Sequence, residues 1–118
     1  TSKKIKVFRK RVFNMPWIKI ESEYDDLDKY KFDDGDIIYY KKDTVMYHNP
    51  YGFSYYSNSG YKEYWLEGKL NRLDGPAIIW PTGQEFYYIN HKELSKEEFK
   101  KHPDRLKYLG KEHLICLG

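Results

Sequence analysis

The fold is decided by the stretch Tyr64-Trp65-Leu66-Glu67-Gly68-Lys69-Leu70-Asn71-Arg72-Leu73-Asp74-Gly75-Pro76-Ala77. Residues 39–52 are a diverged copy that aligns with it without gaps, and residues 87–94 are a third, partial copy. An aromatic pair recurs in the copies at offsets of 25 and 23 residues, with its second member at Tyr40, Trp65 and Tyr88. A repeat of this length indicates stacked hairpin units, because one such unit cannot bury its apolar face alone.

Residues 36–94 alternate between β-branched or aromatic runs and turn residues about every ten positions, as a meander of antiparallel strands requires. The predicted strands are residues 36–40, 53–56, 62–66, 77–80 and 85–89. Tight turns are predicted at residues 43–44, 49–52, 57–60, 67–68, 73–76 and 81–83. The sequence therefore predicts a mainly β fold, an antiparallel meander of repeated hairpins in a single curved sheet.

Residues 1–35 precede the repeats as a basic arm and an acidic lead-in. Weak alternation over residues 4–19 predicts two short strands, or an arm followed by one strand. Within residues 21–36 the apolar positions have helical spacing, but acidic residues and a glycine interrupt them, so a loop or a single helical turn is predicted. The arm carries six basic side chains: Lys3, Lys4, Lys6, Arg9, Lys10 and Arg11.

The pattern changes at Ser95, which forms a capping box with Glu98 and predicts the start of a helix. The helix should end near Lys101, because the residue before Pro103 disfavours helical backbone. Another short helical turn is predicted over residues 103–109, and residues 112–117 have the apolar density of a final strand or a packed tail. Residues 95–118 are thus expected to cap the open end of the repeats and to complete a single domain over residues 1–118.

The composition limits the class of protein. A chain of 118 residues has room for one core, and a 19% aromatic share with thirteen Tyr means that rings build it. The net charge of +3 is far below that of a committed nucleic-acid binder. The one cysteine, Cys116, excludes an internal disulfide, and no stretch has the apolar length of a transmembrane helix or signal peptide. We therefore expect an intracellular protein that does not act at membranes.

The motif in residues 64–78 resembles a repeat common in tailed-phage and giant-virus proteins, in which an aromatic pair and Asn-Gly-Lys precede His-Arg-x-Asp-Gly-Pro-Ala. It is also distantly similar to MORN-type repeats, which are β-hairpin units strung into a curved sheet. The resemblance covers roughly residues 36–100, and here Glu67 and Asn71 replace the usual Asn and His. It implies a viral or phage origin, a place in the virion or the host cytoplasm, and a scaffold or protein-binding role, but no reaction.

The residues that match this motif have expected roles in the backbone of its turns. Gly68 is expected to have a positive φ, Asp74 to hold a turn, and Gly75 and Pro76 to form a rigid exit from it. Arg72 is expected to pair with Asp74 or to stack on Trp80.

No motif in the sequence carries catalytic chemistry. There is no phosphate-binding glycine loop, no nucleophile elbow and no Cys-His pair with catalytic spacing. His113 and Cys116 have a spacing seen in metal sites, but two ligands do not make a structural zinc site. The acidic cluster in residues 21–36 lacks the ligand order of a calcium loop. The chain is therefore predicted to be no enzyme and to use no cofactor or metal.

Binding is the better prediction, because the tyrosines outnumber what one thin sheet can bury. We predict that a protein partner contacts exposed rings at Tyr47, Tyr51, Tyr55, Tyr56 and Tyr61. The opposing interpretation is that paired tyrosines simply cover both faces of the sheet. The alternative function is nucleic-acid binding by the arm, Lys3 to Arg11, with stacking tyrosines. Unpaired edge strands also leave a homo-oligomer open.

Overall fold

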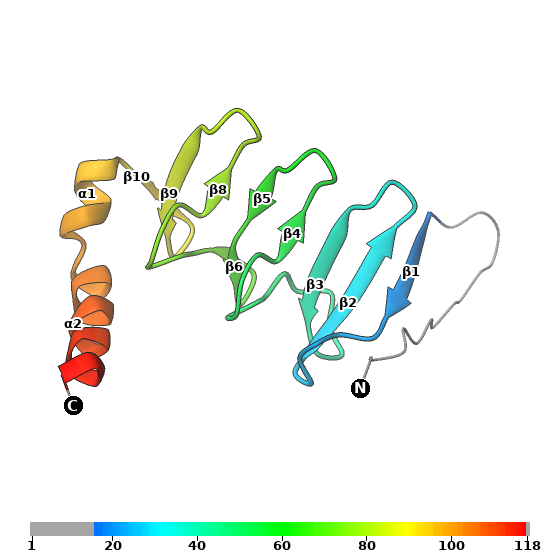
Figure 1. Ribbon diagram of the computed structural model, residues 1–118, viewed down its shortest axis with the longest axis horizontal. Coiled ribbons are helices and arrows are strands. Elements are labelled where there is room, and N and C mark those ends of the chain that lie inside the picture. Colours follow the sequence, from blue (N-terminus) through cyan, green and yellow to red (C-terminus); the bar gives the residue numbers. More distant parts are fainter. Residues whose placement is uncertain (1–15, 118) are drawn as a thin grey trace.

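The computed structural model describes residues 16–117, with side chains described up to residue 110. Its main feature is an eight-stranded antiparallel sheet with the strand order β1-β2-β3-β4-β5-β8-β9-β10, which confirms the predicted mainly β meander (Figure 1). Strands β6 and β7 form a separate two-stranded ribbon between β5 and β8. The strands are β1 (Trp17–Ile20), β2 (Leu27–Phe32), β3 (Ile37–Lys41), β4 (Tyr55–Tyr56), β5 (Lys62–Glu63), β6 (Trp65–Leu66), β7 (Lys69–Leu70), β8 (Ile78–Ile79), β9 (Glu85–Ile89) and β10 (Lys92–Leu94). The helices are α1 (Lys96–Lys101) and α2 (Pro103–Leu117).

Three hairpins share one turn, which lies at the same side of the molecule each time (Figure 1). Gly35, Gly60 and Gly83 each donate their backbone N–H to the carbonyl three residues earlier, and their φ angles are +96°, +102° and +94°. Glycine sets this turn because other residues avoid that backbone region. The glycines lie 25 and 23 residues apart, as the aromatic pairs do. The hairpins β2-β3, β4-β5 and β8-β9 are therefore the three repeat units.

The first unit begins earlier than the sequence predicted. Strand β2 pairs with both β1 and β3, so the prediction of a loop or helical turn over residues 21–36 was wrong. Residues 33–35 form the turn of this hairpin, and the remaining acids are accommodated by charge pairing rather than by exposure alone. Asp28 of β2 is only 4% exposed, and its carboxylate lies 3.4 Å from the ammonium groups of Lys19 and Lys42.

A second turn closes the opposite end of each unit. Glu67 and Gly68 have φ of 50° and 74°, and Asn90 and His91 have φ of 51° and 70°, as two-residue hairpins require. The positive φ expected at Gly68 is thus confirmed. The corresponding turn after β3, with Asp43 at φ 60°, is two residues longer.

This longer turn shifts the alignment of the copies. Tyr39 donates its N–H to Ser54, and Tyr64 donates to Ala77, so the offset between equivalent residues falls from 25 to 23 across the turn. The alignment of 39–52 on 64–77 without gaps is therefore wrong beyond the turn. Residues 49–53 correspond to residues 72–76.

The sheet has two different faces, because side chains alternate along each strand and paired residues point the same way. The face that carries Leu27, Tyr39 and Ile89 is called here the core face, and these side chains are at most 4% exposed. The opposite face is called the ladder face, and it includes Tyr30, Ile38, Tyr40, Tyr55, Glu63, Ile78 and Phe86.

The core face is covered unit by unit over the equivalent positions Tyr39, Tyr64 and Tyr87. The rings of Tyr24 and Phe53 lie 6.1 and 6.0 Å from the ring of Tyr39. The guanidinium of Arg72 lies 3.9 Å from the ring centre of Tyr64. The ring of Phe99 lies 4.6 Å from that of Tyr87. Each unit therefore needs a cover over this tyrosine, and each obtains it from a different side chain.

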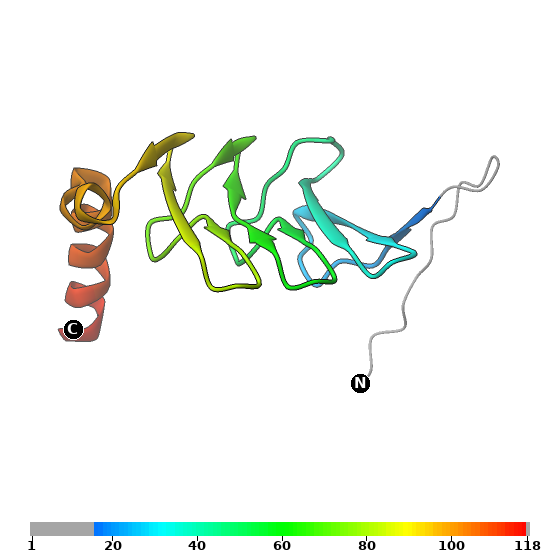
Figure 2. The ribbon, with the colours of Figure 1, turned by 90° about the horizontal axis from the view of Figure 1, so that it is seen from above.

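The last cover is helix α1, which confirms the predicted cap. Ser95 accepts the Glu98 N–H and the Glu98 carboxylate accepts the Ser95 N–H, so the capping box is present. Phe99 is 4% exposed and packs with Ile89 and Leu94. Seen from above, α1 and α2 lie together at the end of the row of hairpins (Figure 2).

Helix α2 corrects the prediction for the C-terminal end. Residues 103–117 form one helix instead of a helical turn followed by a strand or tail over 112–117. Pro103 suits the first turn of a helix, and the Asp104 N–H donates to the His102 ring at 3.1 Å. A short apolar run fits either type of element, and here the helix that has already started continues through it.

Candidate functional site

A continuous row of aromatic rings crosses the ladder face. Neighbouring ring centres lie between 5.1 and 5.7 Å apart, a spacing typical of favourable aromatic pairs. The row runs from β1 to the turn between β9 and β10 and therefore crosses all three units. Its members in order are Trp17, Tyr30, Tyr40, Tyr47, Trp65 and His91.

A second group of rings joins this row through Glu63. Tyr61 lies 6.0 Å from Tyr55 and 4.6 Å from Trp80, measured between ring centres. The Glu63 carboxylate accepts the Tyr61 hydroxyl and also accepts the Trp65 indole N–H at 2.9 Å. Burial and the bond to Glu63 raise the pKa of Tyr61, so its hydroxyl stays protonated. Glu63 thus fixes rings from both groups in place.

The ladder face differs from the core face in what covers it. Within residues 16–110, the loops 21–26, 49–53 and 72–76 and helix α1 pack their side chains against the core face. On the ladder face Val45 is 84% exposed and Trp80 is 45% exposed, and the rings of the row are half-buried. The ladder face is therefore the broad aromatic surface that the described part of the chain leaves accessible.

The five predicted tyrosines do not form one surface. Tyr47, Tyr55 and Tyr61 lie on the ladder face. Tyr56 lies on the core face with its ring 5.3 Å from that of Phe53. Tyr51 stacks on Tyr24 at 4.3 Å and donates its hydroxyl to Asp26 at 2.9 Å, also on the core side. A single flat contact reaches three of the five.

Sequence reasoning missed several ring positions of the ladder face. These are Trp17, Tyr30, Tyr40, Trp65 and Trp80. The signal for Tyr40 and Trp65 was present, because they are the recurring aromatic positions themselves, and Tyr30 and Trp17 follow once β2 is known to be a strand.

The predicted basic arm, Lys3, Lys4, Lys6, Arg9, Lys10 and Arg11, lies outside the described residues. From residue 16 onward the chain has fifteen Lys and Arg against eighteen Asp and Glu, a formal charge of −3. The net charge of +3 thus comes from the arm, and the repeat units themselves are acidic.

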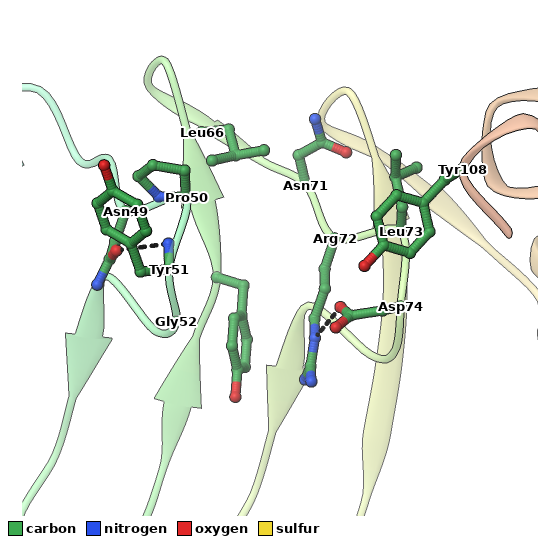
Figure 3. Close-up of a pocket in the computed structure, with 11 residues that line it drawn as sticks. Asn49, Pro50, Tyr51, Gly52, Leu66, Asn71, Arg72, Leu73, Asp74 and Tyr108 are labelled. Atoms are coloured by element: carbon green, nitrogen blue, oxygen red, sulfur yellow. Dashed lines mark hydrogen bonds and ion pairs between the residues drawn. The ribbon is translucent and has the colours of Figure 1, made fainter. Parts of the chain in front are cut away.

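A groove of about 340 Å³ lies on the core side between two loops, 49–53 and 72–76, beside helix α2 (Figure 3). Arg72 holds one of these loops: its Nε donates to Asp74 at 2.8 Å and its Nη1 donates to the Pro76 carbonyl at 3.1 Å. A Cβ on Gly75 would lie 3.0 Å from the Arg72 Cζ, so only glycine fits there. The pairing of Arg72 with Asp74 is confirmed, whereas its ring partner is Tyr64 and not Trp80.

The other loop is held in the same way by a different side chain. Asn49 stands where Arg72 does, and its Nδ2 donates to the Phe53 carbonyl at 2.7 Å. In both loops the side chain reaches the carbonyl four residues later. The polar residues of the motif therefore hold their own loop, which is a structural role.

No protein-family model, curated protein or solved structure matches this chain. The resemblance to viral and MORN-type repeats therefore stays a prediction. Among the described residues, no three His, Cys, Asp or Glu side chains gather where they could hold a metal ion. In the same part of the chain, no helix has both the length and the apolar character to cross a membrane.

Proposed function

We propose that this chain is a non-enzymatic interaction module that binds a protein partner through its ladder face. The observation that carries the proposal is the asymmetry of the sheet. Loops and a helix cover the core face, while the aromatic row of the ladder face stays accessible to solvent within the described residues. Half-exposed Tyr and Trp side chains supply large contact areas at low cost in side-chain entropy and are enriched in binding interfaces.

The rings are also fixed before binding. Adjacent rings contact one another across strands, and Glu63 holds Tyr61 and Trp65 through hydrogen bonds. A surface whose side chains are already ordered loses little conformational entropy when a partner docks. This feature supports a binding role over a purely structural one.

The nucleic-acid alternative has less support. The repeat units carry a formal charge of −3 from residue 16 onward, and phosphate contacts require basic side chains. That function would depend on the arm alone.

The proposal is tested by photo-crosslinking with a reactive residue placed at position 45, 80 or 106 in the full chain. Val45 and Trp80 are exposed on the ladder face, while Leu106 is 52% exposed on α2. The expected result is one protein crosslinked from positions 45 and 80 and not from 106.

Trp80→Glu should weaken capture of that protein at least about tenfold, because a charge would be buried in the contact, while Leu106→Glu should leave capture unchanged. Crosslinking from 106 alone, or equal capture by both variants, would refute the ladder face as the binding site.

A further inference from the structure

A small cavity lies on the ladder face at the end formed by β1, β2 and β3. Its volume is about 230 Å³, and it is open to solvent on one side. Four of its lining residues are aromatic, and the other two are aliphatic. The lining residues are Trp17, Tyr30, Phe32, Ile38, Tyr40 and Val45.

The rings stand as walls around this cavity. The Trp17 and Tyr30 rings meet at 76° with centres 5.3 Å apart, and the Tyr30 and Tyr40 rings meet at 67° with centres 5.4 Å apart. Both Trp17 and Tyr40 are thus steeply inclined to Tyr30. The side chain of Ile38, which is 6% exposed, closes the bottom. Several ring faces therefore border one small space.

Ring faces carry partial negative charge, so a group enclosed by several of them is favoured when it is cationic and disfavoured when it is anionic. No lining residue is charged. An unmodified ammonium would lose its hydration here without gaining a carboxylate partner. A methylated ammonium is large, weakly hydrated and has no need of such a partner, which makes it the cation that this cavity fits best.

We propose that this aromatic cage holds a methylated lysine side chain of the protein partner. The inference rests on the proposed function, since it names one contact of the partner on the ladder face. The cage lies at the opposite end of the sheet from Trp80, so the two proposals are tested at separate residues.

The test compares two short peptides that bind to the full chain, one with trimethyllysine and one with its neutral isostere, in which carbon replaces the ammonium nitrogen. The two side chains have the same shape, so only the charge differs. The chain has three Trp, and the indole N–H resonances of Trp17, Trp65 and Trp80 report by NMR where each peptide binds. Loss of one resonance in Trp17→Phe assigns the signal of Trp17.

We expect saturable shifts at Trp17 and an affinity for the trimethyllysine peptide that exceeds that for the isostere by about fivefold or more. Trp17→Leu should lower the affinity for the trimethyllysine peptide by a similar factor. Tyr51→Leu, which removes an exposed ring on the core side, should leave it unchanged.

The proposal is overturned if the isostere binds as tightly as the ammonium peptide, if shifts are confined to Trp65 and Trp80, or if no saturable shift occurs. This comparison uses the unaltered chain and so does not depend on how a variant folds. Capture of a partner that Trp80→Glu weakens, together with equal binding of both peptides, would retain the interaction module and reject the cage.

The chain's own basic arm is the competing occupant. Replacing Lys3, Lys4, Lys6, Arg9, Lys10 and Arg11 by Gln in the full chain should change the affinity for the trimethyllysine peptide by less than about twofold. A rise of more than about fivefold would assign the cage to the arm and overturn its role in partner binding.

Discussion

The second and third repeat units cover the same core tyrosine in different ways. Tyr64 lies under Arg72, which comes from a loop of its own unit and is held there by Asp74. Tyr87 lies under Phe99, which comes from helix α1 and is almost fully buried. The difference shows that the repeat requires a cover over this position but does not fix its chemistry. The last unit has no further loop of this kind, so the helix supplies the cover.

The apolar cover should contribute the most to stability. Phe99→Ala is expected to lower the free energy of unfolding by about 3–4 kcal/mol, because a buried ring is lost and a cavity remains. Denaturant unfolding of the full chain measures this, with Leu106→Ala on the exposed side of α2 as the control. A loss below about 1 kcal/mol would mean that α1 does not close the repeats.

The opposite end of the sheet relies on charge instead. Burial alone would raise the pKa of Asp28, but the Asp43 N–H and the ammonium groups of Lys19 and Lys42 outweigh it and hold the pKa below its ordinary value. A depressed folded-state pKa means that the carboxylate stabilises the fold above the ordinary value of about 4, and that this contribution is lost as the pH falls through the folded-state value.

Asp28→Asn is therefore expected to cost about 2 kcal/mol at neutral pH and less in acid. Unfolding free energies measured from about pH 7 to pH 2 should show a shallower acid slope in the variant than in the wild type. Some slope should persist, since the pKa of Glu23 is also lowered: hydrogen bonds from Lys29 and Tyr39 outweigh the effect of its burial. Parallel slopes in the two proteins would contradict this role of Asp28.

The polar cover of the second unit should contribute less. Arg72→Ala removes the contact with Tyr64 and two hydrogen bonds on a partly exposed side chain, so a loss of about 1–2 kcal/mol is expected. Arg72→Asn should recover part of this loss, because Asn49 holds the equivalent loop in the first unit. If the Asn variant is as unstable as the Ala variant, the two loops are not equivalent in energy.

The shared turn gives the smallest expected effect. Gly60→Ala should cost about 1 kcal/mol, because its φ of +102° strains an L-residue while the nearest contact of the added methyl, Pro81 at 3.9 Å, is ordinary. Gly110→Ala in α2, where nothing lies within 4 Å, should be neutral or stabilising by a few tenths of a kcal/mol. Thermal unfolding of both variants separates backbone strain from steric contact, and equal midpoints would exclude strain at Gly60.

Local patterns determined much of this fold. The aromatic repeat predicted the hairpins, the turn residues predicted most turns, and Ser95 with Glu98 predicted α1 and its start. These features depend on neighbouring residues, so one sequence suffices to read them. The glycine spacing of 25 and 23 residues also carried the information for the first hairpin.

Contacts between distant segments were decided only by the tertiary structure. The acid-rich segment 27–32 becomes a strand because β1 and β3 pair with it on both sides and because Lys19 and Lys42 approach Asp28. The division of the tyrosines between the two faces depends on strand register and on which loop covers which ring. A shift of one residue in register reverses the face of every side chain in a strand, so composition could indicate an aromatic surface but could not locate it.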